Sequence, residues 1–432
     1  MRLLHRLFDV QRATAAERRA TAWTAAMFAC AMASTFVLRP LRDQFGVDQG
    51  PRQMPHLYTI TLAVTLVFTP LFWWLIRRRS SRQFVPLALQ AFAASMVLWF
   101  FGLGAIGDFD WKAPGHRWIG EAFWGFFSAF NVAVPTLVWI HIVEYFRREQ
   151  GLRLFGLVSV GGTLGAVIGP QLARWLTQGL SLRPAYAAIG SLLLLQATWY
   201  CHRRSQRACA AALPGAGIGD QIAPGSALAG LRLLARSPRL LGIAGYMVLL
   251  AMVATAFAVA KTQLVGEQVA GARDQLLWFA DVETWTQTLT LALQLFTTSR
   301  LLRRLPQWLF LCLLPLLGTL GLGALWVWPT ALAIGIIEVL RRGGQFALEK
   351  PARELLYTPL DLATKHKVKF LLDTVAFRFG DLLGAHYQVT LREYALSSGT
   401  VALATVALAI VWAVLGVTLG RRPERAQPAP IA

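Results

Sequence analysis

The sequence predicts an all-α polytopic membrane protein, and three features of its composition support this fold class. Of its 432 residues, 56% are hydrophobic and only 15% are charged. The chain contains 16 Trp, and its mean hydropathy is +0.49. Soluble globular domains are less apolar than this, so the composition indicates a chain that crosses a bilayer many times.

About twelve apolar segments have the length that a spanning helix needs, which is roughly 20 residues. The first set lies near 20–38, 56–76, 84–106, 118–142, 154–177 and 184–201. The second set lies near 239–260, 276–298, 307–327, 329–348, 369–391 and 398–419. Ala31-Met32-Ala33 imitates a signal-peptidase site, but we expect the first segment to be retained as a spanning helix.

The two sets predict two six-helix bundles, 1–201 and 239–432. Residues 202–238 between them are rich in Arg, Ala, Gly and Pro, which indicates a cytoplasmic linker. If the helices alternate in direction, most of the 42 Lys and Arg fall on one side of the membrane. The positive-inside rule places that side and both termini in the cytoplasm. This layout is that of the major facilitator architecture, in which the halves rock around a central site.

The net charge of +20 does not indicate a nucleic-acid partner, because the basic residues form short runs between apolar segments. The four cysteines form no CxxC pair and stand near no His cluster, so we expect no disulfide framework and no metal site. His141 and His386 fall within predicted helices, and neither has a Ser, Cys or carboxylate at a spacing that suggests nucleophilic catalysis. We therefore expect neither an enzyme nor a cofactor.

Ionisable side chains within the predicted spans are candidate functional residues, because they are costly in hydrocarbon. They are Glu121, Asp281, Glu283, Glu338, Arg341, Arg342, Asp373, Arg378 and Asp381. Asn131 lies deeper in the same predicted helix as Glu121, and Arg39, Arg42 and Asp43 cluster where the first predicted helix ends.

Spacing predicts some of the ion pairs among these residues. Glu338 precedes Arg341 and Arg342 by three and four residues, so one helical face can pair them as gating or structural salt bridges. Arg378 and Asp381 are also three residues apart, and we expect Arg378 to line a cavity.

Glycine recurs every four residues at Gly161, Gly165 and Gly169. This segment lacks the GxxxxGK[ST] pattern and a flanking strand, so it is not a phosphate-binding loop. The spacing is typical of a small-residue stripe that lets two helices approach closely.

One region resembles a known family. The strings PARELLYTPLD at 351–361, KHKVK at 365–369 and DTVAFRFG at 373–380 resemble the signature of the ATP/ADP translocases of plastids and intracellular bacteria. The string LRPLRD at 38–43, the string EAFWG at 121–125 and the acidic pair Asp274 and Asp281 also resemble segments of that family. The sequence departs from the pattern at Asp381, where the classical exchangers carry a lysine, and the chain is shorter than they are.

The resemblance implies a nucleotide antiporter that works by alternating access. Fixed cations would attract and hold the phosphates, with Arg39 and Arg42 near one mouth, Lys365, Lys367 and Lys369 near the other, and Arg378 between them. Acidic residues would pair with these cations in the empty carrier. The expected substrate-binding residues are Arg39, Arg42, Asp43, Glu121, Asn131, Asp281, Arg353, Lys369, Asp373, Arg378 and Asp381.

The expected partners are an anionic nucleotide or organophosphate and the lipid bilayer, and we expect a monomer in a bacterial inner membrane. Three other interpretations stay open at this point. The protein could be a proton-coupled facilitator for a siderophore, drug or peptide, with Glu121, Asp281 or Asp381 as proton carrier. It could be a polytopic enzyme that acts on a lipid-linked phosphate, although no long loop carries an acidic or metal motif. It could also be a structural or signalling membrane protein.

Overall fold

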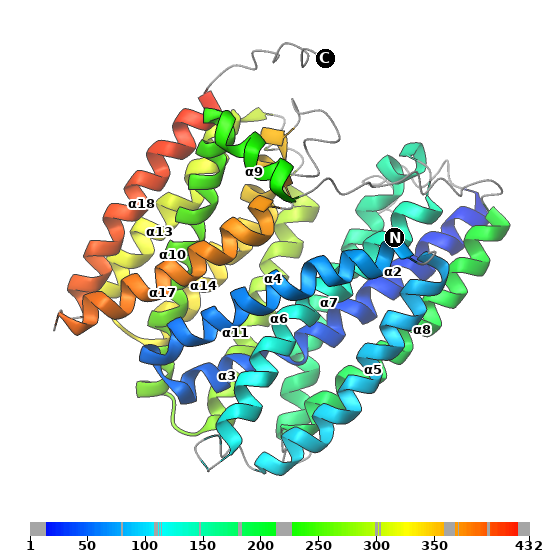
Figure 1. Ribbon diagram of the computed structural model, residues 1–432, viewed down its shortest axis with the longest axis horizontal. Coiled ribbons are helices and arrows are strands. Elements are labelled where there is room, and N and C mark those ends of the chain that lie inside the picture. Colours follow the sequence, from blue (N-terminus) through cyan, green and yellow to red (C-terminus); the bar gives the residue numbers. More distant parts are fainter. Residues whose placement is uncertain are drawn as a thin grey trace. The chain divides into compact units, whose positions relative to one another are not determined.

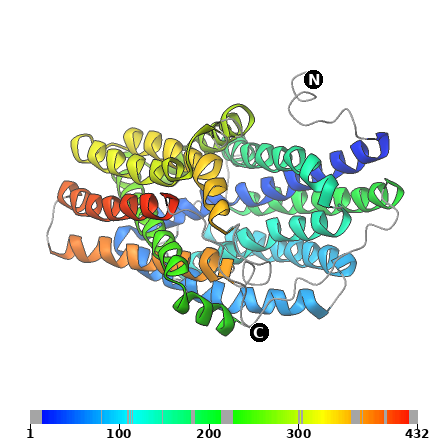
Figure 2. The same ribbon diagram turned by 90° about the horizontal axis from the view of Figure 1, so that it is seen from above.

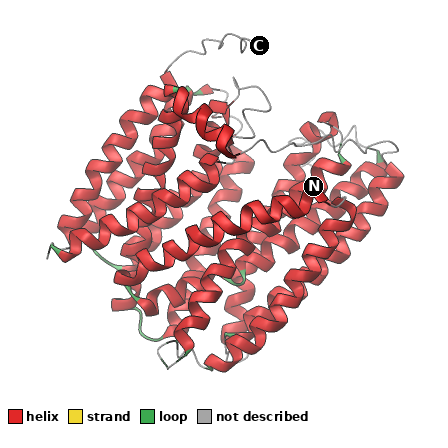
Figure 3. Cartoon of the chain, viewed as in Figure 1, coloured by secondary structure: helices red, strands yellow, loops and turns green. Residues whose placement is uncertain are grey.

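The computed structural model describes residues 14–78, 81–107, 111, 113, 115–146, 148–179, 184–212, 227–298, 301, 304–357, 368–369, 371–394 and 398–421. Helices dominate these ranges, and no strand occurs within them (Figure 3). The predicted all-α class is confirmed.

The first half of the chain forms long helices that run in both directions (Figure 1). They are α2 (Ala15–Phe36), α3 (Arg39–Gln49), α4 (Met54–Arg78), α5 (Ser81–Ile106), α6 (His116–Tyr145), α7 (Arg148–Gly179) and α8 (Ala185–Ala212). A short 3₁₀ turn, η2 (Pro51–Gln53), precedes α4. Helix α8 continues past residue 201, so the first part of the predicted linker is helical.

The second half is also helical but is interrupted more often. Its α-helices are α9 (Ala227–Arg236), α10 (Pro238–Gln268), α11 (Ala272–Leu293), α13 (Gln307–Val327), α14 (Ala331–Gly344), α15 (Lys350–Glu354), α17 (Phe377–Glu393) and α18 (Ser398–Arg421). Three π-helical segments accompany them, η3 (Gln294–Thr298), η4 (Gln345–Glu349) and η6 (Leu371–Ala376), with a 3₁₀ turn at η5 (Leu355–Tyr357).

Within the described ranges, eight helices are long and apolar enough to cross a membrane. The predicted spans at 184–201, 276–298, 329–348 and 369–391 are not among them. The last three correspond to α11, α14 and α17, which carry most of the predicted buried charges, and charged residues lower the mean hydropathy of a helix. Length and composition therefore support eight spans directly, while the count of twelve stays a prediction.

The first predicted span was expected to end near residue 38, and the structure corrects this boundary. The chain turns at Val37 and Leu38 and then continues as α3, so one apolar segment runs over Ala15–Gln49. Pro40 fits this turn because the first turn of a helix does not need its missing N–H. The Arg42 amide donates to the Leu38 carbonyl oxygen at 3.1 Å and continues the backbone ladder. Arg39, Arg42 and Asp43 therefore lie on a helix.

The chain forms two compact units. Unit 1 comprises Met1–Asp48, Val64–Gln221 and Gly271–Gln287, and unit 2 comprises Gln49–Ala63, Ile222–Ala270 and Thr288–Ala432. The division falls inside α4 and α11, so each of these helices contributes to both units. The functional division into two six-helix bundles stays a prediction.

In unit 1, α2 packs against α6, α7 and α8. The predicted glycine stripe of α7 faces α2. A Cβ atom at Gly161 would lie 2.4 Å from the Ala25 carbonyl oxygen, and one at Gly165 would lie 2.0 Å from the Ala29 carbonyl oxygen. Such distances are too short for any side chain, so the predicted close helix packing is confirmed.

In unit 2, α10 packs against α14, α17 and α18, while α13 and α18 lie side by side (Figure 2). Gly380 and Gly384 of α17 form a second stripe. A Cβ atom at Gly380 would lie 2.7 Å from the Val248 carbonyl oxygen, and one at Gly384 would lie 2.8 Å from the Met252 Cα. The sequence analysis did not identify this stripe, although the spacing of four residues was present.

Candidate functional site

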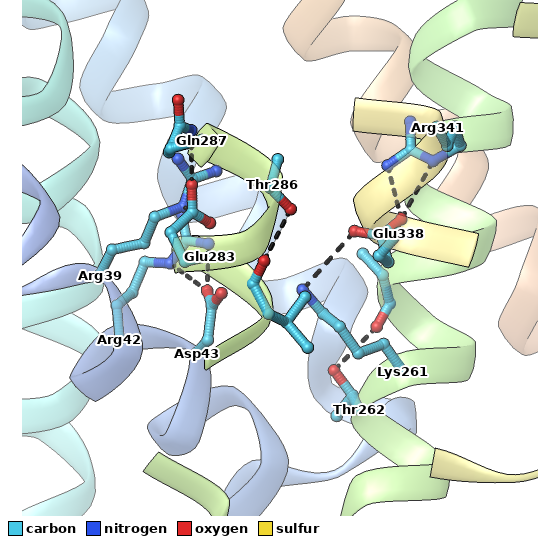
Figure 4. A network of polar contacts seen from close by, with 12 residues as sticks. Arg39, Arg42, Asp43, Lys261, Thr262, Glu283, Thr286, Gln287, Glu338 and Arg341 are labelled. Atoms are coloured by element: carbon cyan, nitrogen blue, oxygen red, sulfur yellow. Dashed lines mark hydrogen bonds and ion pairs between the residues drawn. The ribbon is translucent and has the colours of Figure 1, made fainter. Parts of the chain in front are cut away.

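Arg39 and Glu283 form an ion pair in unit 1 (Figure 4). The pair joins α3 to α11, with 3.4 Å between the Arg39 Nε and a Glu283 carboxylate oxygen. The Gln287 amide donates to the other Glu283 oxygen at 2.8 Å, one helical turn further on. The Glu283 side chain is only 3% exposed, so its charge depends on these partners. The sequence marked Glu283 as ionisable, but spacing could not predict a partner so far away in the chain.

Arg42 lies next to Asp43 (Figure 4), and it also contacts two aromatic rings of the same unit. Its Nε donates to Asp43 Oδ1 at 2.8 Å. Its guanidinium carbon lies 4.8 Å from the centroid of the Trp124 ring and 5.1 Å from that of Phe127, both on α6. A guanidinium held by stacking and by one acid is well placed to exchange that acid for another anion.

Asp281 pairs with Arg174 of α7 rather than with a predicted binding residue. Next to this pair, the Gln171 amide donates to the Thr284 hydroxyl at 2.8 Å. The Arg174 and Asp281 side chains are 36% and 41% exposed, so water screens their attraction. The contacts tie α7 to α11, and a role of Asp281 in substrate binding stays a prediction.

Glu121 and Asn131 lie on α6. The Arg117 Nε donates to a Glu121 oxygen at 2.9 Å, and the Arg117 side chain is 53% exposed. This pair belongs to the first turns of a single helix. Asn131 is half-buried further along α6. The binding roles of both residues stay predictions.

In unit 2, Glu338 lies between two cations (Figure 4). Its Oε1 accepts from Arg341 Nη2 at 2.6 Å, and its Oε2 lies 3.9 Å from the Lys261 Nζ. The Arg341 guanidinium also lies 5.2 Å from the Phe257 ring centroid. The predicted pairing of Glu338 with Arg341 is confirmed. The Arg342 guanidinium carbon lies 5.8 Å from the centroid of the Phe346 ring, and the gating role of these residues stays a prediction.

Lys261 is a site residue that the sequence analysis missed. The predicted span ended at 260, which assigned Lys261 to a loop. The structure extends α10 to Gln268, so Lys261 lies inside the helix, and its side chain is 11% exposed.

Arg378 and Asp381 of α17 form the ion pair that their spacing predicts. Arg378 Nη1 donates to Asp381 Oδ2 at 3.0 Å, and the Thr255 hydroxyl of α10 donates to Asp381 Oδ1 at 3.1 Å. The Asp381 side chain is 7% exposed and that of Arg378 is 23% exposed. The acid at position 381 therefore neutralises the cation that was expected to hold phosphate.

A second group of charges surrounds η4 and α15. Arg353 Nη1 lies 3.3 Å from a carboxylate oxygen of Glu349, whose side chain is fully buried. Burial raises the pKa of Glu349, while the positive charge of Arg353 opposes this shift. Sequence analysis placed Glu349 at the edge of a cytoplasmic loop and did not identify it as a site residue.

Lys369 belongs to the same region. Its Nζ donates to a Glu354 oxygen at 2.8 Å, and the substrate-binding roles of Lys369 and Asp373 stay predictions. Lys365 and Lys367, which were expected to attract phosphate at one mouth, lie outside the described residues.

Several candidate residues share one arrangement, in which a cation is paired with an acid of the same unit. The pairs are Arg39 with Glu283, Arg42 with Asp43, Lys261 and Arg341 with Glu338, Arg353 with Glu349, and Arg378 with Asp381. Each pair allows a positively charged side chain to lie in the low-dielectric interior, because the acid compensates its charge. An incoming anion could take over a cation only by displacing its acid.

Comparison with solved structures identifies the fold. A variant of the nucleoside transporter NupG matches with a TM-score of 0.62 and 13% identity, covering 94% of this chain and 99% of that one. NupG itself matches with a TM-score of 0.61 and 14% identity, covering 95% of this chain and 100% of that one. A bacterial homologue of the human lysosomal transporter Spinster, in an inward-facing conformation, matches with a TM-score of 0.54 and 14% identity, covering 94% of this chain and 96% of that one.

No protein-family model matches the chain, and no curated protein matches it either. The likeness to solved structures extends over nearly the whole chain, but the identity is low, so it establishes the fold and not the substrate. The chain is an all-helical, multi-pass membrane protein with a major facilitator-like fold.

Proposed function

We propose that the protein is a membrane transporter that works by alternating access and exchanges a nucleotide or a related organophosphate. The observation that carries this proposal is the pairing of partly accessible arginines with acids. Arg42 with Asp43 in unit 1 and Arg378 with Asp381 in unit 2 are the clearest cases. The major facilitator-like fold supports transport, and the resemblance of residues 351–380 to the ATP/ADP translocases supports a phosphorylated substrate.

Each pair suggests how substrate is bound. An arginine fork can donate two hydrogen bonds to a phosphate and so replace its single carboxylate partner. In the empty carrier, the acid keeps the arginine neutralised and holds the helix in one state. Bound phosphate would release that acid, so substrate favours the change of state and the empty carrier resists it. This behaviour produces obligatory exchange, because return without cargo is slow.

One observation favours a less highly charged substrate as a second candidate. The acid at position 381 replaces the lysine of the classical exchangers, and it pairs with Arg378 and accepts from Thr255. Two neighbouring cations would suit the charge of ATP, whereas a cation paired with an acid suits a monophosphate or a neutral nucleoside. The structural neighbour NupG is described as a nucleoside transporter.

Uptake into proteoliposomes tests both candidates. Purified protein would be reconstituted with and without internal ADP, and the uptake of labelled ATP, ADP, AMP and adenosine would be compared. Uptake of a phosphorylated substrate that needs internal nucleotide supports exchange. Uptake of adenosine alone supports the second candidate, and uptake that a protonophore abolishes at fixed membrane potential supports proton coupling instead.

The residue assignment has a matched pair of variants. Arg378→Gln should reduce uptake at least tenfold, because a charge-assisted hydrogen bond contributes about 1.5–3 kcal/mol. Arg421→Gln serves as the control, since Arg421 is exposed at the end of α18. Unchanged uptake by Arg378→Gln would rule out the assigned role. We also propose a monomer in a bacterial inner membrane, and the distribution of Lys and Arg favours both termini inside.

A further inference from the structure

Unit 2 contains a pocket that is separate from the ion pairs described above. The pocket has a volume of about 280 Å³. It lies at the carboxyl ends of α10, α13 and α17 and the amino end of α18. Its polar wall carries Gln263 and Glu267 of α10 and Arg392 of α17.

Arg392, Gln263 and Glu267 form a chain of hydrogen bonds. Arg392 Nη1 donates to Gln263 Oε1, and Gln263 Nε2 donates to a Glu267 oxygen at 2.7 Å. Arginine can only donate and a carboxylate can only accept, so the orientation of the Gln263 amide is fixed. The Gln263 oxygen thus accepts from the Arg392 cation, and the Gln263 nitrogen donates to the Glu267 anion. A ligand with one negative and one positive group could replace both contacts of this neutral amide with stronger, charge-assisted ones.

Gln268 and Gln388 also line the pocket, and its apolar residues include three buried leucines. Leu264, Leu322 and Leu325 line it with exposures of 8%, 3% and 6%. Glu267 is exposed, so the pocket runs from a polar rim to an apolar floor. Within the described residues, the Arg392 Nε is buried and makes no hydrogen bond. A buried donor without an acceptor is costly, and a bound anionic group would satisfy it.

We propose that this pocket binds a small zwitterion that carries an apolar group. Arg392 takes the carboxylate or phosphate, Glu267 takes the ammonium, and the leucine floor takes the apolar part. A simple anion would face the Glu267 carboxylate, and a simple cation would face Arg392, so neither matches both charges. The volume equals that of about nine water molecules, which suits a hydrophobic amino acid or the headgroup region of a zwitterionic phospholipid.

Three probes that share the same apolar side chain test whether the pocket requires both charges of the ligand. L-leucine carries both charges, L-leucinamide carries only the positive one, and 4-methylpentanoate carries only the negative one. Binding to the purified full-length protein would be measured by isothermal titration calorimetry. L-leucine should bind at least tenfold more tightly than either analogue, because each lost charge removes about 1.4 kcal/mol or more. Equal binding of the three probes would overturn the proposal.

A second arm distinguishes a free solute from a lipid. Short-chain phosphatidylethanolamine, which is zwitterionic, would be compared with short-chain phosphatidylglycerol, which is anionic. Binding of leucine only indicates an amino-acid site, and selective binding of phosphatidylethanolamine indicates a lipid site. Binding of neither zwitterion would overturn the proposal.

Variants place the binding in this pocket. Arg392→Gln and Glu267→Gln should each weaken zwitterion binding about tenfold, and Ala260→Phe should abolish it by filling the lined volume. Arg52→Gln and Glu393→Gln are the matched controls, because both residues are exposed in unit 2 and do not line the pocket. Folding is checked by the thermal unfolding midpoint. Binding that persists in all three pocket variants would overturn the proposal, and nucleotide uptake is a separate readout that this site does not require.

Discussion

At the scale of single residues, the structure shows which ion pairs a sequence can predict. Arg378 with Asp381 and Glu338 with Arg341 follow from a spacing of three residues on a helix. The partner of Glu283 is Arg39, on a helix far away in the sequence, and only tertiary packing brings the two together. Spacing identifies local pairs, whereas hydropathy marks a buried charge without naming its partner.

Glu349 and Arg353 provide a test of such a pair, because both side chains are almost fully buried. Arg353→Met should destabilise the protein by roughly 3–5 kcal/mol, since it leaves the Glu349 charge uncompensated. The double variant Arg353→Met/Glu349→Leu should recover most of this loss, because no buried charge remains. Thermal unfolding of the purified protein in detergent measures both effects. A double variant no more stable than the single variant would contradict this account.

The pKa of Glu349 predicts a dependence of stability on pH. Burial raises this pKa above its ordinary value of 4.5. An acid with a raised folded pKa binds its proton more tightly in the folded state, so its stabilising contribution is present below pH 4.5 and is lost as the pH rises through the folded pKa. The unfolding midpoint of the natural protein should therefore fall, relative to Glu349→Gln, as the pH rises above about 4.5. The exposed Glu393→Gln variant controls for other titrations, and parallel pH profiles for Glu349→Gln and the natural protein would exclude the effect.

At the scale of helices, close packing through glycine recurs in both units. The α7 stripe meets α2, and the α17 stripe meets α10. The first stripe could be predicted from the sequence because three glycines repeat there, whereas only Gly380 and Gly384 mark the second. The predicted first span ended at residue 38, since a proline and two arginines resemble a helix end when hydropathy alone is considered.

Substituting one glycine of the stripe should separate two helices. Gly165→Ala places a methyl group 2.0 Å from the Ala29 carbonyl oxygen, so α7 and α2 must move apart. We expect a destabilisation of about 1–3 kcal/mol, which is typical of overpacking. Gly323→Ala is the control, because nothing lies within 4 Å of its added Cβ. That control should be neutral or slightly stabilising, and equal unfolding midpoints for the two variants would contradict the packing argument.

At the scale of the whole molecule, the sequence predicted the all-helical class and the major facilitator-like layout, because composition and segment length depend on the bilayer alone. It also predicted helices near 276–298, 329–348 and 369–391, where α11, α14 and α17 lie, but the charged residues of these helices leave their crossing of the membrane without support from hydropathy. The substrate could not be predicted from composition or from helix packing, because neither determines which molecule the polar residues bind.

Orientation in the membrane is also a property of the whole molecule, and cysteine labelling tests it. The natural cysteines, Cys30, Cys201, Cys209 and Cys312, would first be replaced by serine. Tyr394→Cys should react with an impermeant maleimide on intact cells, because Tyr394 is 75% exposed after α17, on the predicted outer side. Arg421→Cys, at the end of α18, should react only after permeabilisation. The reverse pattern would invert the proposed orientation.

The π-helical segments η4 and η6 determine the directions in which the charged side chains that follow them point. A π turn contains one residue more than an α turn, and each residue of an α-helix adds about 100° of rotation. The extra residue in η6 therefore determines the direction in which Arg378 and Asp381 point around the helix axis. The extra residue in η4 does the same for Arg353. Deleting a single residue from η6 would restore the regular α-helical hydrogen bonds and rotate Asp381 away from Thr255. The length of this one turn therefore determines which side chains are in contact.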